Sequence, residues 1–266
     1  MSKRDKKLRL GGMALQNGLL VHGPTHWAAA VRTRGGDVKA ASGRKPRLHA
    51  VDPVPGVRGV ARLAEAFVVI PLVKRALPEA RLPFQDAGVL AVAAGASVGG
   101  TLLRRHVRGA GGEAAAAAVS VLPALFALRG GDLAAYHGVE HKAIGAYEAD
   151  AEDAADASKE HDRCGSHLVA PMLAANLAGT LLLRRAVDRP GPLAGGAVAL
   201  ASTAAAVEVF AWSERHAGSS LARALKRPGF EIQRLVGTRE PDERQLEVGR
   251  AALAEILRAE GEHAAA

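Results

Sequence analysis

Charged residues are unevenly spread along the chain and leave four long apolar segments. These alanine-rich segments carry at most one charged residue or histidine and run over Ala87–Leu103, Ala114–Leu128, Cys164–Leu183 and Leu193–Trp212. A helix that crosses a bilayer needs about twenty apolar residues, with a lower limit of about seventeen. We therefore predict a mainly α-helical fold, in which a membrane bundle of about four spans occupies residues 86–214.

Buried helices of a soluble bundle would have a similar composition, because alanine contributes little to membrane insertion. Two further features favour the membrane. Gly95 and Gly99 allow the close backbone approach by which membrane helices pack. Paired arginines follow two of the segments, at Arg104-Arg105 and Arg184-Arg185, where they are typical of interface anchors.

Residues 1–60 differ in character and predict a small β-rich unit behind a basic tail. Leu19–His22 and Trp27–Thr33 are β-compatible, and Gly35-Gly36-Asp37 could join the second run to Val38–Ser42 as a hairpin. The basic start, MSKRDKKLRL, is expected to be a solvated tail; a nucleic-acid arm and a membrane-surface contact are the alternatives.

The stretches on either side of the apolar region predict amphipathic helices. Residues 61–85 are expected to form an interfacial helix that lies against the bilayer or the β unit, with a kink at Pro71. Residues 215–266 form a polar tail that ends in a helix from about Asp242 to Ala259, which the preceding turn caps.

Four spans place both termini and the loop 129–167 on one side of the membrane. That side carries most of the lysine and arginine, so we expect it to be cytoplasmic in a multi-pass protein of the cell membrane. The net charge is +8, and the basic face could bind anionic lipid or a protein partner. Aromatic residues make up only 3% of the chain, which argues against nucleic-acid binding. The oligomeric state is not determined.

The densest chemistry lies in Tyr136-His137-Gly138-Val139-Glu140-His141-Lys142. On a helix, His137, Glu140 and His141 project from one face. In an HxxEH motif two imidazoles hold zinc, and the carboxylate is placed to take a proton from the bound water. The alternative for such a short motif is that the histidines and the glutamate make ordinary surface contacts or hydrogen bonds to neighbouring carbonyls.

A third ligand has to come from elsewhere, and HDRCGSH supplies candidates about twenty residues downstream. His161, Cys164 and His167 recur there at three-residue spacing, and Cys164 is the single cysteine of the chain. We predict a divalent-metal site, with zinc as the ion, in which Glu140 is catalytic and His137, His141, Cys164 and His161 are ligands. Further candidates are Tyr136, Lys142, Glu148, His167, Glu208, His22 and His26.

Several stretches together resemble the YqhQ family of bacterial membrane proteins, whose function is unknown and whose members are described as predicted metal-dependent enzymes. They include GGMALQNGLLVHGPTHWAAAVR, YHGVEHKAIGAYE, HDRCGS and RPGFEIQRLVGTREPDERQLEVG. The resemblance implies a multi-spanning protein with a β-containing N-terminal part and a metal site, and it implies no substrate. Met13, Asn17 and His22 depart from the family's opening, where Asn17 replaces a glutamate.

Two functions compete on this evidence. One is a membrane-embedded, metal-dependent hydrolase in which Glu140 acts on the bound water. The other is a non-catalytic membrane scaffold or interaction protein, in which a closed metal site fixes the central loop. Transport would draw on Glu208, a carboxylate within an apolar segment, but the internal repeats typical of transporters are not evident.

Overall fold

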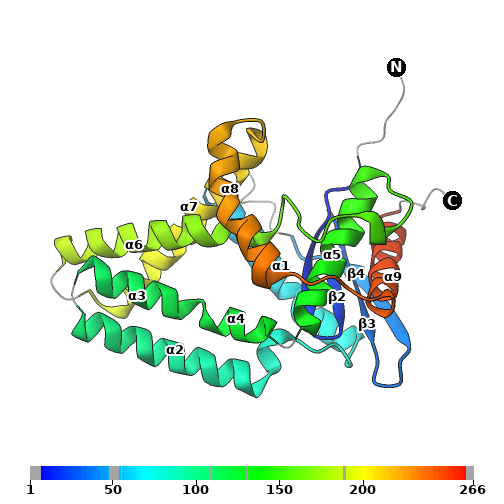
Figure 1. Cartoon of the computed structure of the whole chain (residues 1–266), viewed down its shortest axis with the longest axis horizontal. Coiled ribbons are helices and arrows are strands. Elements are labelled where there is room, and N and C mark those ends of the chain that lie inside the picture. Colours follow the sequence, from blue (N-terminus) through cyan, green and yellow to red (C-terminus); the bar gives the residue numbers. More distant parts are fainter. Residues whose placement is uncertain are drawn as a thin grey trace.

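The computed structural model describes residues 7–47, 54, 56–107, 109–129, 131–187 and 190–261. The first six residues of the predicted basic tail lie outside the described residues. The chain is mainly helical, with a small antiparallel sheet near its N-terminus and a helical C-terminus. Long apolar helices extend to one side of the part that contains the sheet (Figure 1).

The sheet is an antiparallel meander in the order β1-β2-β3-β4. Its strands are β1 (Gly11–Leu15), β2 (Gly18–His22), β3 (His26–Arg32) and β4 (Val38–Arg44). The predicted hairpin is confirmed, because β3 pairs with β4 in a register that joins Arg32 to Val38. Its turn needs a glycine at position 36, where φ is 97°.

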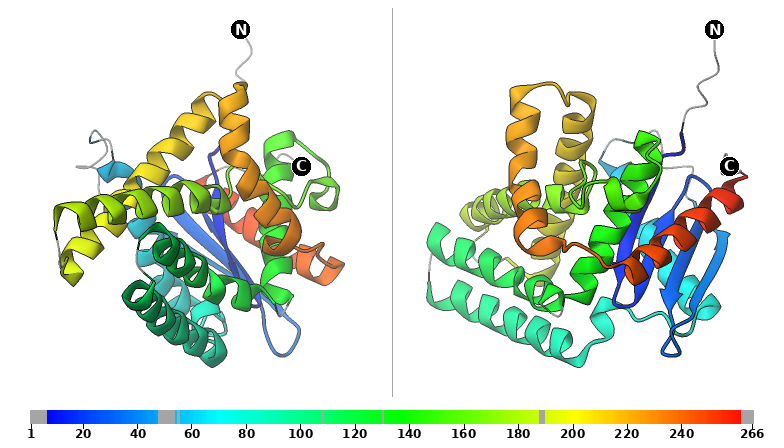
Figure 2. Two further views of the ribbon diagram at one scale, coloured as in Figure 1. Left: turned by 60° about the vertical axis from the view of Figure 1, so that its left-hand side comes forward. Right: turned by 45° about the vertical axis from the view of Figure 1, so that its right-hand side comes forward.

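Helices cover both faces of the sheet, so its central strands are buried throughout. On one face lie α5 (Asp132–Ala149), against β1 and β2, and α9 (Glu243–Glu260), against β2, β3 and β4 (Figure 2). Leu19 and Val21 point to this layer, whereas Leu20 packs with α1 (Val57–Ala76) on the other face. This alternation is what a strand with a period of two requires between two helical layers.

Helix α1 starts and ends earlier than the interfacial helix expected over residues 61–85. It continues through Pro71, and a short 3₁₀ turn, η2 (Pro83–Gln85), follows. Val69 and Val73 are buried against the sheet, whereas Phe67 and Val68 are exposed. The helix thus has one apolar face on the β unit and a second apolar face that the protein leaves uncovered.

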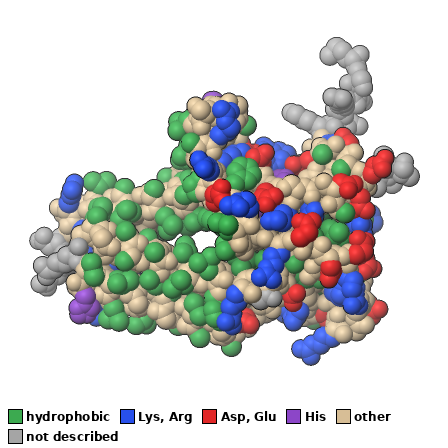
Figure 3. Space-filling view, viewed as in Figure 1, with side chains coloured by type: hydrophobic (Ala, Val, Ile, Leu, Met, Phe, Trp, Pro, Cys, Tyr) green, Lys and Arg blue, Asp and Glu red, His purple; other side chains and the backbone are tan. Residues whose placement is uncertain are grey.

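Within the described part of the chain, four helical segments are long and apolar enough to cross a membrane, as predicted. They are α2 (Ala87–His106), α3 (Ala110–Ser120) with α4 (Leu122–Leu128), Gly165–Ala186, which contains α6 (Val169–Ala186), and α7 (Pro192–Arg215). The second is broken at Val121, two residues before Pro123, which lacks the N–H that a continuous helix would use. Apolar side chains dominate the surface of this region, and charged ones cluster on the part with the sheet (Figure 3). This pattern indicates a membrane-embedded protein.

A buried carboxylate links three of the apolar helices at the end remote from the sheet. Glu113, in the first turn of α3, lies 3.0 Å from Nε of Arg104 on α2 and 2.7 Å from Nη2 of Arg184 on α6. The glutamate side chain is only 3% exposed. The ion pairs therefore tie the α2–α3 pair to the α6–α7 pair.

The C-terminal part returns the chain from the apolar helices to the sheet. Helix α8 (Ser220–Ile232) runs into one turn of π-helix, η5 (Gln233–Gly237), before α9 begins. Asp242 accepts the N–H of Gln245 at 2.8 Å, and the Gln245 side chain accepts the N–H of Asp242 at 3.0 Å. This capping box confirms the predicted start of the last helix.

Candidate metal centre

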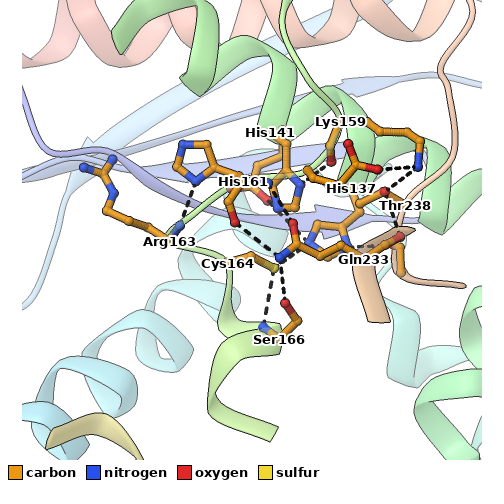
Figure 4. Close-up of polar contacts among 12 residues, drawn as sticks. His137, His141, Lys159, His161, Arg163, Cys164, Ser166, Gln233 and Thr238 are labelled. Atoms are coloured by element: carbon orange, nitrogen blue, oxygen red, sulfur yellow. Dashed lines mark hydrogen bonds and ion pairs between the residues drawn. The ribbon is translucent and has the colours of Figure 1, made fainter. Parts of the chain in front are cut away.

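Two histidines of α5 and the cysteine that precedes α6 converge beside the sheet. His137 and His141 stand one turn apart on α5, with ring centroids 4.4 Å apart. Cys164 lies at the start of η4 (Gly165–Leu168), the 3₁₀ turn before α6. One donor atom from each of the three residues lies within 4.8 Å of the other two (Figure 4).

Backbone carbonyls fix the orientation of both imidazoles. Nδ1 of His137 lies 2.8 Å from the carbonyl oxygen of Gly237, and Nδ1 of His141 lies 2.6 Å from that of Lys159. A carbonyl only accepts, so each Nδ1 carries the proton, and in the neutral ring Nε2 keeps its lone pair. Metal-ligating histidines are held in this way.

Both lone pairs point into the three-residue group. Nε2 of His141 is buried and has no hydrogen-bond partner within the described part of the chain. Nε2 of His137 faces Sγ of Cys164 at 3.4 Å. A buried ring nitrogen that has lost water without gaining a partner is costly, and a cation would satisfy it.

The spacing of the donors fits a cation after a small contraction. Any three atoms within 4.8 Å of one another lie within about 2.8 Å of a common point, whereas zinc–nitrogen and zinc–sulfur bonds are roughly 2.0–2.3 Å long. Two imidazoles and a thiolate are also donors that divalent transition metals prefer. His137, His141 and Cys164 could therefore hold a metal ion.

Glu140 borders the group from the same helix. One of its carboxylate oxygens lies 3.9 Å from Nε2 of His137 and 3.8 Å from Nε2 of His141. The glutamate is buried against β1, where an added Cβ at Gly12 would overlap its side chain. Burial raises the pKa of Glu140, and His137 opposes that shift.

Burial also sets the protonation of the two most enclosed donors. Loss of water lowers the pKa of His141 to about 3, helped by His137, so this ring is neutral at physiological pH. Loss of water raises the pKa of Cys164 to about 11, helped by Glu140, so the thiol keeps its proton unless a cation displaces it.

Gln233 holds the loop that carries Cys164, and nothing in the sequence marked this residue as important. It is fully buried in the π-helical turn. Its Oε1 accepts the N–H of His161 at 2.7 Å, and its Nε2 donates to Oγ of Ser166 at 2.9 Å. The same turn supplies the Gly237 carbonyl, so one short element supports two of the three donors. Single π-helical turns are frequent at functional sites.

The other two histidines of HDRCGSH lie near the group but make different contacts. Nε2 of His161 lies 3.2 Å from Oε2 of Glu148, and its Nδ1 accepts the N–H of Arg163. Nδ1 of His167 faces the carbonyl of Lys226 at 3.0 Å. Of the described residues, only His137, His141 and Cys164 form the donor group.

Lys142 ties the acidic loop to α5. Its ammonium group donates to the carbonyls of Ala155 and Ala157 at 2.9 and 2.8 Å and lies 2.6 Å from the carboxylate of Glu240. The lysine is buried. These bonds hold the loop against α5, the helix that carries His141. The same loop supplies the Lys159 carbonyl that is hydrogen-bonded to the His141 imidazole.

Tyr136 and Glu208 lie in other surroundings. Tyr136 of α5 packs in the core against the sheet and α9, beside the Arg32 side chain. Glu208 of α7 accepts the N–H of Gly56 at 2.9 Å, at the N-terminus of α1. A carboxylate is favourable there because the N-terminal end of a helix carries a partial positive charge.

His22 and His26 belong to the β unit. His22 lies on β2, and both of its ring nitrogens are buried without a hydrogen-bond partner among the residues described. Nδ1 of His26 is 2.8 Å from Oγ1 of Thr25. Neither is part of the three-residue donor group.

Fold and site together define a membrane-embedded helical protein with a small antiparallel sheet and a His/His/Cys group that could hold a metal ion. Residues 132–259 match a family model described as "Protein of unknown function (DUF1385)". The match starts at the first residue of α5 and contains all three donors. No curated protein and no solved structure matches the chain.

Proposed function

We propose that this protein is a zinc-dependent hydrolase of the cell membrane. The observation that carries the proposal is the pair of Nδ1–carbonyl hydrogen bonds, which direct two imidazole lone pairs toward one cysteine. Zinc fits a donor set of two imidazole nitrogens and one sulfur. Three protein ligands leave the fourth position open for catalysis.

Glu140 is the general base of the proposed reaction. Bound zinc would supply Lewis acidity and lower the pKa of a water at the open position. The glutamate lies close to both imidazoles, so its carboxylate can take the proton from that position.

We propose that the part with the sheet faces the cytoplasm. Its surface carries most of the charged side chains, and cytoplasmic segments are enriched in lysine and arginine (Figure 3). Arg104 and Arg184, at the opposite end, are both paired with Glu113. The positive charge of these two arginines is therefore partly cancelled on the non-cytoplasmic side, which should be poor in positive charge.

A closed structural site is the second candidate, because Glu140 is near enough to become a fourth ligand after a small movement. The burial of Glu140, His141 and Cys164 favours it. In that arrangement the metal would join the Cys164 loop to α5 without catalysing a reaction.

Metal analysis of the detergent-purified full chain tests the ligands. Replacement of both histidines, His137→Ala with His141→Ala, should abolish a stoichiometric zinc content, because it removes two of the three donors of the site. The exposed pair His106→Ala with His216→Ala serves as the control and should keep the metal. Equal zinc in both variants would refute the site.

Cobalt substitution separates the open site from the closed one. In the open arrangement, added azide should alter the visible spectrum of the Co²⁺-loaded protein, because it occupies the fourth position. Glu140→Gln should keep the metal and this response. A spectrum that azide leaves unchanged in the original chain, but that Glu140→Gln alters, would establish the closed structural site instead.

A further inference from the structure

Two adjoining cavities lie where α5 begins, between the sheet and the ends of the apolar helices α2 and α4. Their volumes are about 200 and 340 Å³, and they share Gln16, Arg81 and Asp132 in their walls. We call them together the arginine groove. The metal centre is separate, since none of its three donors lines either cavity.

Arginines dominate the charge of this groove. Five line it: Arg32, Arg34, Arg81, Arg129 and Arg244. Arg32 is paired with Glu247 at 2.6 Å, and the guanidinium of Arg129 lies 3.5 Å from the centre of the Phe126 ring. Across the described chain, the side chains of Arg34, Arg81 and Arg244 make no ion pair. Their charge is available to an anion.

Three aspartates also line the groove, but two of them are already engaged. Asp86 accepts the N–H of Val89 at the start of α2, and Asp242 accepts the N–H of Gln245 at the start of α9. Asp132 is the first residue of α5. Five arginines face these three aspartates, so positive charge remains in excess, beside a helix N-terminus that has no side-chain cap.

A buried asparagine builds the polar wall of the groove. The side-chain amide of Asn17 donates to the carbonyl of Arg32 at 2.8 Å and accepts the N–H of Arg81 at 2.8 Å. Asn17 is 7% exposed. Its contacts fix the backbone at two of the arginines.

The wall on the membrane side is apolar. Val89 of α2, Phe126 and Ala127 of α4, and Leu133 of α5 line the smaller cavity together with Arg81 and Arg129. The groove thus changes from cationic to apolar at the level where the apolar helices leave the charged part. This change matches an amphiphile with an anionic head, and the bilayer supplies such molecules.

We propose that the arginine groove binds the phosphate of an anionic phospholipid, whose acyl chains lie along α2 and α4. Guanidinium groups recognise phosphate oxygens through paired hydrogen bonds. The proposal is independent of the metal centre and of its chemistry.

Competition between two lipids tests the groove. The full chain is purified in detergent with equal amounts of phosphatidylglycerol and phosphatidylcholine, and bound lipid is counted by mass spectrometry of intact complexes. Phosphatidylglycerol should be retained in preference. The double change Arg34→Gln with Arg81→Gln should lower its retention about tenfold, because two cations near the headgroup are lost.

The control removes the same charge elsewhere, by Arg44→Gln with Arg223→Gln, and should retain the lipid as the original chain does. Folding is checked by circular dichroism and should be unchanged, because Arg34 and Arg81 are exposed and their side chains make no ion pair in the described structure. Equal losses in the two variants, or no loss in either, would overturn the proposal. Displacement of the lipid by an equal concentration of soluble glycerol phosphate would also overturn it.

Discussion

The position of Glu140 depends on the absence of a side chain at Gly12. A Cβ at that glycine would lie 2.5 Å from Cγ and 2.7 Å from Oε1 of the glutamate. Neither atom can retreat freely, because Glu140 is buried between α5 and β1. The neighbouring Gly11 has open space at the same point. Alanine substitutions at Gly12 and at Gly11 therefore differ in the steric clash of one methyl group with Glu140.

We predict that Gly12→Ala destabilises the protein by about 1–3 kcal/mol and displaces Glu140 from its place beside the donor group, because overpacking forces a buried side chain to move. Thermal unfolding in detergent measures the first effect, and the spectrum of bound Co²⁺ measures the second. Gly11→Ala should change neither. Similar melting of the two variants would show that Glu140 adjusts without cost.

At the scale of elements, β2 carries a titratable group into the layer between sheet and α1. Burial lowers the pKa of His22 to about 4, and the charge of Lys45 adds to the shift. In the unfolded chain the pKa is near 6.5. The neutral ring thus favours folding above pH 6.5, and this contribution is lost as the pH falls toward 4.

We expect the free energy of unfolding to fall by up to about 3 kcal/mol between pH 7 and pH 4 through His22. Melting temperatures across this range measure the effect. His22→Phe should make the pH dependence shallower, because the substituted ring does not titrate. His106→Phe, at the exposed end of α2, should leave the slope unchanged, and equal slopes for all three chains would contradict the assignment.

For the whole molecule, Glu113 is the contact that joins the two pairs of apolar helices far from the sheet. Its two arginine partners are both about one third exposed, so water screens them only in part. Removing one member of such a network leaves the remaining charges without their partner. The distal end of the bundle should therefore loosen when this carboxylate is neutralised.

Glu113→Gln is predicted to lower stability in detergent by about 1–3 kcal/mol, measured by thermal unfolding. Glu231→Gln is the matched control, because Glu231 pairs with Arg234 on an exposed surface and contributes under about 1 kcal/mol. If the control melted as early as Glu113→Gln, the buried network would have no special role.

Local patterns in the sequence determined the helical class, the four apolar segments, the β3–β4 hairpin and the capped C-terminal helix. Each depends on residues a few positions apart, as does the common face of His137, Glu140 and His141. The resemblance to the YqhQ family stays a prediction, and so do the catalytic and ligand roles of the site residues.

Tertiary structure decided which residues meet. His161, Cys164 and His167 are equivalent by spacing, but Gln233 and its neighbours orient the loop so that Cys164 alone joins the two imidazoles. Glu208 meets the N-terminus of α1 from the distant helix α7, and Gly12 makes room for Glu140 from another strand. Such contacts depend on how elements far apart in the chain pack together. The local periodicity of the sequence carries no information about that packing.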